Sequence, residues 1–128
     1  MENKKIQNYD YIRIFNHDDG SIALCFDIEN DKILEIGDEM NEIVEEAYMN
    51  GYNWDAFLHA YLAENAPDIL VGMNTDPEAG TYVAYYEKGN AENEEKTIRF
   101  AEIIISLMEN KEQLFKFLRE KGEYIEWD

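Results

Sequence analysis

Residues 9–28 read YDYIRIFNHDDGSIALCFDI and carry the clearest structural signal in the chain. Aromatic and β-branched side chains crowd residues 9–16, which predicts a strand. Asp19-Gly20 is a two-residue hairpin signal of type I′, because both residues tolerate a positive φ. Residues 21–28 return with apolar side chains on alternate positions, so an antiparallel hairpin is expected. Cys25 falls on the other face of this strand and is expected to be an inert filler.

After this hairpin the apolar period changes to that of a helix. The spacing i, i+3, i+4, i+7 predicts an amphipathic helix over 38–49, and its members are Met40, Ile43, Val44 and Ala47. Asp38 is its expected N-cap. A second helix is predicted over 54–64, capped by Asn53 and carrying Trp54 on its apolar stripe. Pro67 then permits one further helical turn at about 66–71.

The second half of the chain repeats the change from strand to helix. Asp76-Pro-Glu-Ala-Gly80 predicts a turn, and residues 81–87 predict a central strand because both of their faces are apolar or aromatic. Helices are predicted over 96–109 and 111–121, and the tail 123–128 either pairs as a short strand or stays free. The order predicts an α+β fold, with a small antiparallel sheet and four helices packed mainly on one face. No linker is visible, so we expect one domain over 1–128.

Composition and charge limit the classes of function. Of 128 residues, 45% are hydrophobic, while 29 acidic and 11 basic residues give a net charge of −18. No dense Lys/Arg cluster is present, so binding to nucleic acid or to an anionic membrane surface is not expected. No apolar run is long enough for a membrane span or a secretory signal. The single cysteine allows no intramolecular disulfide, whereas small secreted domains usually contain pairs of cysteines. We therefore expect a cytoplasmic protein whose partner is basic.

Residues able to carry chemistry are few and scattered. His17 lies beside the hairpin turn, His59 lies off the apolar stripe of its helix, and neither Ser21 nor Ser106 sits on a nucleophile elbow. Asp76 and Glu78 form a carboxylate pair, but the turn lacks the further acids of a calcium loop. We expect no catalytic residue, no metal site and no cofactor.

An acidic band follows the hairpin and is opposed only by Lys32. It consists of Asp27, Glu29, Asp31, Glu35, Asp38, Glu39, Glu42, Glu45 and Glu46. Two interpretations are open. The band is a solvated face kept for solubility, or it is a compact negative surface that binds a basic groove in a partner.

Several short motifs together resemble a known family. They are Gly51-Tyr52-Asn53-Trp54, Ala66-Pro67-Asp68-Ile69-Leu70, Asp76-Pro77-Glu78-Ala79-Gly80 and Tyr82-Val83-Ala84-Tyr85. In this order, over roughly residues 50–110, they resemble the immunity protein 51 family of bacterial polymorphic toxin systems. We expect structural tasks for the motif residues, which are Gly51, Tyr52, Trp54, Asp76, Pro77, Glu78 and Gly80. Trp54 is expected to anchor its helix in the core, and residues 76–80 are expected to set the turn.

The resemblance implies a protein that is made beside a toxin and holds it inactive in the cytoplasm. An acidic inhibitor suits a toxin with a basic active-site cleft, such as a nuclease, because a polyanionic substrate requires one. Two other classes stay open: an acidic adaptor that binds a basic protein unrelated to any toxin, and a hydrolase using Asp76 and Glu78. The oligomeric state is not defined by the sequence.

Overall fold

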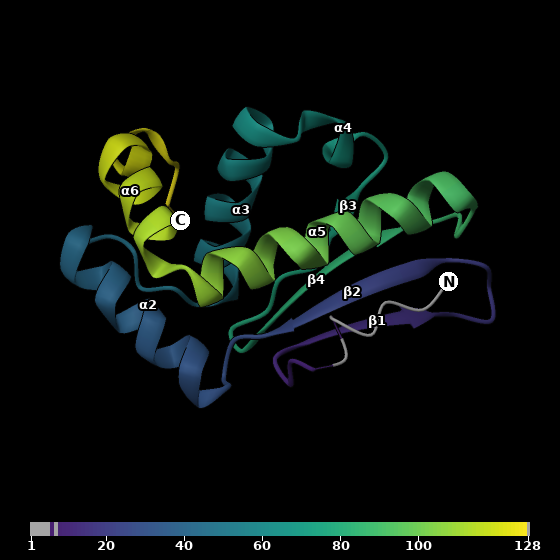
Figure 1. Cartoon of the computed structure of the whole chain (residues 1–128), viewed down its shortest axis with the longest axis horizontal. Coiled ribbons are helices and arrows are strands. Elements are labelled where there is room, and N and C mark those ends of the chain that lie inside the picture. Colours follow the sequence, from purple (N-terminus) through teal and green to yellow (C-terminus); the bar gives the residue numbers. More distant parts are fainter. Residues whose placement is uncertain (1–5, 7, 128) are drawn as a thin grey trace.

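A four-stranded antiparallel sheet forms one layer of the molecule (Figure 1). The computed structural model describes residue 6 and residues 8–127. Within them the strand order is β1-β2-β4-β3, with bounds of Ile12–Asn16 for β1, Ile22–Asp27 for β2, Asn74–Thr75 for β3 and Thr81–Tyr86 for β4. β4 pairs on both sides, so the prediction of a central strand here is confirmed. β3 was not predicted, since two residues carry no periodicity.

The first hairpin is confirmed, but its turn differs from the prediction. Asn16 pairs with Ile22, and the N–H of His17 donates to the carbonyl of Ser21. The N–H of Gly20 donates to the carbonyl of His17, and Gly20 has a φ of 92°. Type I′ would require a positive φ at two successive residues, whereas here the three-residue loop 18–20 places only its glycine in that region.

Five helices and one 3-10 turn accompany the sheet in the described residues. Their bounds are Asp31–Ile43 for α2, Gly51–Asn65 for α3, Pro67–Leu70 for α4, Ala91–Glu109 for α5, Lys111–Lys121 for α6 and Gly122–Tyr124 for the 3-10 turn. Figure 1 shows α5 running along the sheet, with α2, α3 and α6 gathered at one end. The predicted α+β class, the helical turn after Pro67 and the last helix are all confirmed.

Three helices begin earlier than the sequence suggested, each at an asparagine cap. The side chains of Asn30, Asn50 and Asn90 accept backbone N–H bonds at 3.0, 2.9 and 2.8 Å. The predicted caps Asp38 and Asn53 lie inside helices instead, and residues 91–95 are helical although they are polar. The reason is competition, because each helix start offers more than one residue able to cap.

The largest correction concerns the predicted helix 38–49. α2 starts seven residues before Asp38 and ends at Ile43, after which Val44 takes an extended conformation. Its buried stripe is Ile33, Ile36, Gly37 and Met40. This stripe has the same spacing as the predicted one, shares Met40 with it and lies on the same helix face, so periodicity alone did not determine where the helix begins and ends. Ala47 is still buried, from the segment between α2 and α3.

The helices cover one face of the sheet. Register aligns Ile12, Phe26 and Tyr82 across three strands, and all three are buried against the helical layer. Trp54 of α3 meets Phe26 edge-on with ring centroids 5.1 Å apart. On the other face the side chains are mainly exposed or half-buried, as at Phe15. The apolar residues on that buried face therefore share one core with the helices.

The tail left open by the sequence forms the 3-10 turn and then an extended segment. Ile125 is buried, and the Trp127 indole donates to the carbonyl of Gly122 at 2.9 Å. Among the described residues the tail pairs with no strand. This packing brings residues 124–126 beside α3, where they become part of a pocket.

Candidate functional site

The outer face of α2 carries a stripe of carboxylates. At 100° per residue, Asp31, Glu35, Asp38, Glu39 and Glu42 fall within an arc of about 100°. The buried stripe of the same helix lies opposite. All five are exposed except Glu39, which is half-buried. The fold therefore collects these five charges on one face, here called the α2 acidic stripe.

The other members of the predicted band lie apart from this stripe. Asp27 is half-buried and accepts the N–H of Glu29 at 3.0 Å, so it shapes the turn after β2. Glu29 packs beside Gly80, and Glu45 and Glu46 are exposed in the segment that follows α2. Of the nine predicted residues, only Glu39 has an ion pair among the described residues, with Lys111 at 3.1 Å. Within the described residues, the stripe is therefore largely unpaired.

Two of the family-like motifs meet at the start of α3. The N–H of Gly51 donates to the carbonyl of Ala79 at 3.1 Å. A Cβ atom on Gly51 would lie 1.6 Å from the carbonyl oxygen of Glu78, so no side chain fits there. The turn itself is closed by the N–H of Glu78 donating to the carbonyl of Thr81. The motifs are thus one packed junction, although 25 positions separate Gly51 from Asp76.

The remaining motif residues divide between core and surface. Trp54 is fully buried, and Asn53 accepts the backbone N–H of Met49 at 2.9 Å. That bond supports Met49, whose φ of 55° lies in the left-handed region. Tyr52 instead points its ring toward solvent with 45% exposure. Asp76 and Glu78 are exposed, and Pro77 is half-buried.

A pocket of about 520 Å³ opens on a second face of α3. Five of its lining residues follow the spacing i, i+3, i+4, i+7, i+8: Tyr52, Asp55, Ala56, His59 and Ala60. The core face of α3 uses the intervening positions, such as Trp54, Phe57 and Leu58. The alanines leave the space that larger side chains would fill. We call this feature the α3 pocket.

Distant segments complete the α3 pocket. Thr75 of β3 lines it, together with Tyr124, Ile125 and Glu126 of the tail. Burial raises the pKa of Asp55, while its hydrogen bond with Thr75 and the nearby His59 oppose that rise. Within the described residues, no ion pair reaches Asp55 or Glu126. In the described part of the chain, the pocket therefore holds a partly desolvated carboxylate that forms no ion pair.

Sequence reasoning placed His59 on a solvated face and missed the pocket. His59 is exposed, as expected, but it lies in the line of pocket residues. The sequence does carry a sign of the pocket: small and polar residues recur at helical spacing between the core residues of α3. Cys25 is half-buried, and burial raises the pKa of its thiol, which disfavours the reactive thiolate. In the part of the chain that the structure describes, no three His, Cys, Asp or Glu side chains are grouped as metal ligands.

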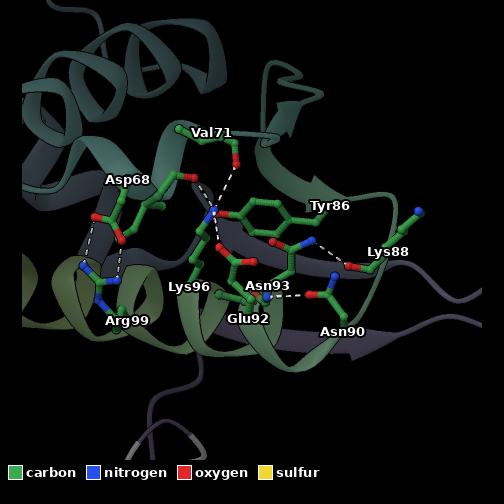
Figure 2. Close-up of polar contacts among 11 residues, drawn as sticks. Asp68, Val71, Tyr86, Lys88, Asn90, Glu92, Asn93, Lys96 and Arg99 are labelled. Carbon is green, nitrogen blue, oxygen red and sulfur yellow. Dashed lines mark hydrogen bonds and ion pairs between the residues drawn. The ribbon is translucent and has the colours of Figure 1, made fainter.

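A second polar cluster, where α4 meets α5, is satisfied internally (Figure 2). Arg99 pairs with both carboxylate oxygens of Asp68, at 2.6 and 3.1 Å. Lys96 donates to the carbonyl of Val71 at 3.3 Å and lies 5.7 Å from the ring centroid of Tyr86. Burial raises the pKa of Tyr86 to about 12, and its hydroxyl donates to the carbonyl of Ile69. These contacts fasten α4 to α5 and β4.

Among residue 6 and residues 8–127, no helix is long and apolar enough to cross a membrane.

Comparison with known proteins agrees with the motifs. The chain matches no curated protein and no solved structure significantly. The sequence profile of a family described as immunity protein 51 matches residues 12–123. The match covers every described strand and α2 to α6, including the junction between Gly51 and the turn before β4. The chain therefore belongs to the immunity protein 51 family.

Proposed function

We propose that this protein is an immunity protein that binds a cognate bacterial toxin in the cytoplasm and neutralises it by binding, without catalysis. Membership of an immunity protein family supports this role. The toxin is expected to be the product of the neighbouring gene. On this proposal the relevant features of the molecule are its surfaces, and the α2 acidic stripe is a strongly charged one.

The observation that carries the proposed mode of binding is the geometry of that stripe. Five carboxylates share one face of α2, opposite the core, and only Glu39 is paired with a described cation. Keeping like charges so close together gains little for the fold, because they repel each other. Such a surface complements a basic cleft and accelerates the encounter with it. A nuclease toxin fits this description, since its groove must bind a polyanion.

Association kinetics with the neighbouring gene product test the proposal. The variant Glu35→Gln/Asp38→Asn/Glu42→Gln removes three charges from the stripe. Its matched control, Glu87→Gln/Glu95→Gln/Glu120→Gln, also removes three exposed charges. These lie directly after β4, in α5 and in α6. We expect the stripe variant to associate roughly tenfold more slowly at low salt and to show a flatter salt dependence. The dissociation rate should change little.

Two outcomes would contradict the proposal at different levels. If the two triple variants associate equally fast, the stripe is a solvated face and the interface lies elsewhere. If the wild-type protein neither binds nor inhibits the neighbouring gene product, the role in immunity to that toxin is wrong.

A further inference from the structure

The α3 pocket combines three features that are typical of an interaction site. It has a concave shape, a half-buried carboxylate and two exposed tyrosines at its border. Its volume of about 520 Å³ lies in the range of sites that bind small groups. Tyr52 is 45% exposed and Tyr124 is 74% exposed, although both line the pocket. Aromatic rings left in water beside a hollow are typical of interaction sites.

We propose that the α3 pocket receives one arginine side chain of the partner protein, with the guanidinium group at Asp55. The inference rests on the proposed function, because it assigns the pocket to the toxin interface. It adds a second contact that differs in kind from the α2 acidic stripe.

The charge of the pocket selects a cation. Among the described residues that line it, Asp55 and Glu126 are the carboxylates and His59 is the only basic side chain. An anionic group would meet both carboxylates in a partly desolvated site, which is unfavourable. A cation would supply the ion-pair partner that Asp55 lacks among the described residues. The ligand is therefore positively charged.

The shape and lining of the pocket favour arginine over lysine. A guanidinium is planar, donates two parallel hydrogen bonds to one carboxylate and stacks on aromatic rings. Tyr52 and Tyr124 offer such rings, and the hydroxyl of Thr75 already holds the Asp55 carboxylate. The apolar surface of Ala56, Ala60 and Ile125 suits the methylene stem of an arginine. A lysine ammonium would keep the charge attraction but lose the stacking and the paired bonds.

A small probe separates the pocket from general attraction to an acidic protein. N-acetyl-arginine methylamide is titrated into the ¹⁵N-labelled protein and followed by NMR. Its uncharged isostere, N-acetyl-citrulline methylamide, is the matched ligand control. We expect saturable shifts at the amides of residues 52–60 and 124–126, in the millimolar range, with the arginine probe alone. Equal shifts with both probes, or arginine shifts confined to residues 31–42, would overturn the inference.

Two variants separate charge from shape. Asp55→Asn keeps the size of the side chain and removes the charge, whereas Ala60→Leu keeps every charge and fills the pocket. Each should abolish the saturable shifts, and Glu120→Gln on α6 should leave them unchanged. Shifts that persist in both pocket variants would show that the probe binds elsewhere and would overturn the inference.

The same variants distinguish this inference from the proposed function. With the toxin, Asp55→Asn should weaken affinity by roughly 30-fold through faster dissociation, since truncating one partner of a desolvated pair acts on that rate. If the wild-type protein binds the toxin and Asp55→Asn binds equally well, the pocket inference is wrong and the proposed function stands. If the wild-type protein binds no toxin, the proposed function fails, and the pocket's assignment to a toxin interface fails with it.

Discussion

α2 and α3 follow each other in the chain, but α2 holds most of its carboxylates in water while α3 holds one of its two, Asp55, partly buried. α2 places five on one solvated face and packs the other face against the core. α3 places a single one, Asp55, in a hollow between two alanines and the tail. The 13 residues of α2 carry more charge than the whole of α3, yet water screens that charge strongly. In the α3 pocket, one charge interacts more strongly because it is partly desolvated.

The difference separates two tasks in recognition. Many exposed charges set the long-range field, and with it the rate of encounter and its salt dependence. One partly buried charge with a defined shape around it affects the lifetime of the complex. The helices also differ in tolerance, because α2 is confined mainly by its buried stripe while α3 contacts the core, the turn before β4 and the tail. The two helices should therefore respond differently to the same substitution.

The largest expected difference between the two helices is in the free energy of unfolding after a glycine in each is replaced by alanine. In Gly51→Ala the new methyl group would lie 1.6 Å from the carbonyl oxygen of Glu78. The junction must move apart, and we expect the free energy of unfolding to fall by about 3 kcal/mol or more. In Gly37→Ala the nearest atom is Cβ of Met49 at 3.0 Å. Here the gain in helix propensity, about 1 kcal/mol, opposes the tight contact, so the change should stay within about 1 kcal/mol.

Urea unfolding of both variants at one pH measures this contrast. Equal losses would mean that the junction at Gly51 yields as readily as the α2 packing, and that the motif pair is not a rigid unit.

A smaller difference in the free energy of unfolding is expected when an asparagine near one end of each helix is replaced by alanine. Asn53 accepts the buried N–H of Met49, which has a left-handed φ. Asn53→Ala leaves that N–H without its acceptor, and we expect a loss of about 1–3 kcal/mol. Asn41 donates to the carbonyl of Glu45 at 2.9 Å, in an exposed setting where water can replace it. Asn41→Ala should cost less than about 1 kcal/mol, and thermal or urea unfolding ranks the two. The opposite ranking would mean that the hydrogen bond at the start of α3 contributes less to stability than the one at the end of α2.

The arrangement of strands and helices was predictable because their periods differ. Alternation in residues 21–28 and the helical spacing in residues 96–109 each fixed an element and its buried face. The starts of helices were less predictable, since Asn30 and Asp38, or Asn50 and Asn53, are equally good caps in isolation. Tertiary contacts made the choice. Gly51 fits against the turn carbonyl only as the first residue of α3, which leaves Asn50 as the cap.

The candidate sites were predictable to different degrees, again because tertiary contacts decide what local sequence patterns leave open. The acidic band is visible as composition, but which of its members lie on the helix depends on where α2 begins and ends. The predicted helix grouped Glu45 and Glu46 with Asp38 and Glu42, whereas α2 groups Asp31 and Glu35 with them. Half of the α3 pocket is visible in the spacing of Asp55 and His59. Its other half comes from Thr75 and the tail, and no local pattern predicts that these segments meet α3.

The smallest effects depend on pH and contrast Asp55 of α3 with Glu109, the last residue of α5, which is bonded to Lys32 of α2. Burial raises the pKa of Asp55 from its ordinary value of 3.8, so the folded state holds that proton more tightly than the unfolded chain. Its charged form therefore destabilises the fold at pH 7. The fold regains that stability as the pH falls through the raised pKa of Asp55 toward its ordinary value. Glu109 behaves oppositely, because its hydrogen bonds with Lys32 of α2 and with Tyr11 lower its pKa from 4.5. Its stabilising effect is present above that value and is lost below it.

Single neutral substitutions isolate these contributions from the other carboxylates, which titrate in the same range. At pH 7 we expect Asp55→Asn to unfold with an equal or higher free energy than the wild type. Glu109→Gln should be less stable by under about 1 kcal/mol, because the Lys32–Glu109 pair is partly exposed. Both differences from the wild type should shrink when urea unfolding is repeated at about pH 3. If Asp55→Asn is instead less stable at pH 7, the carboxylate of Asp55 is stabilised inside the fold. In that case the α3 pocket already satisfies its charge and does not require a cation from a partner.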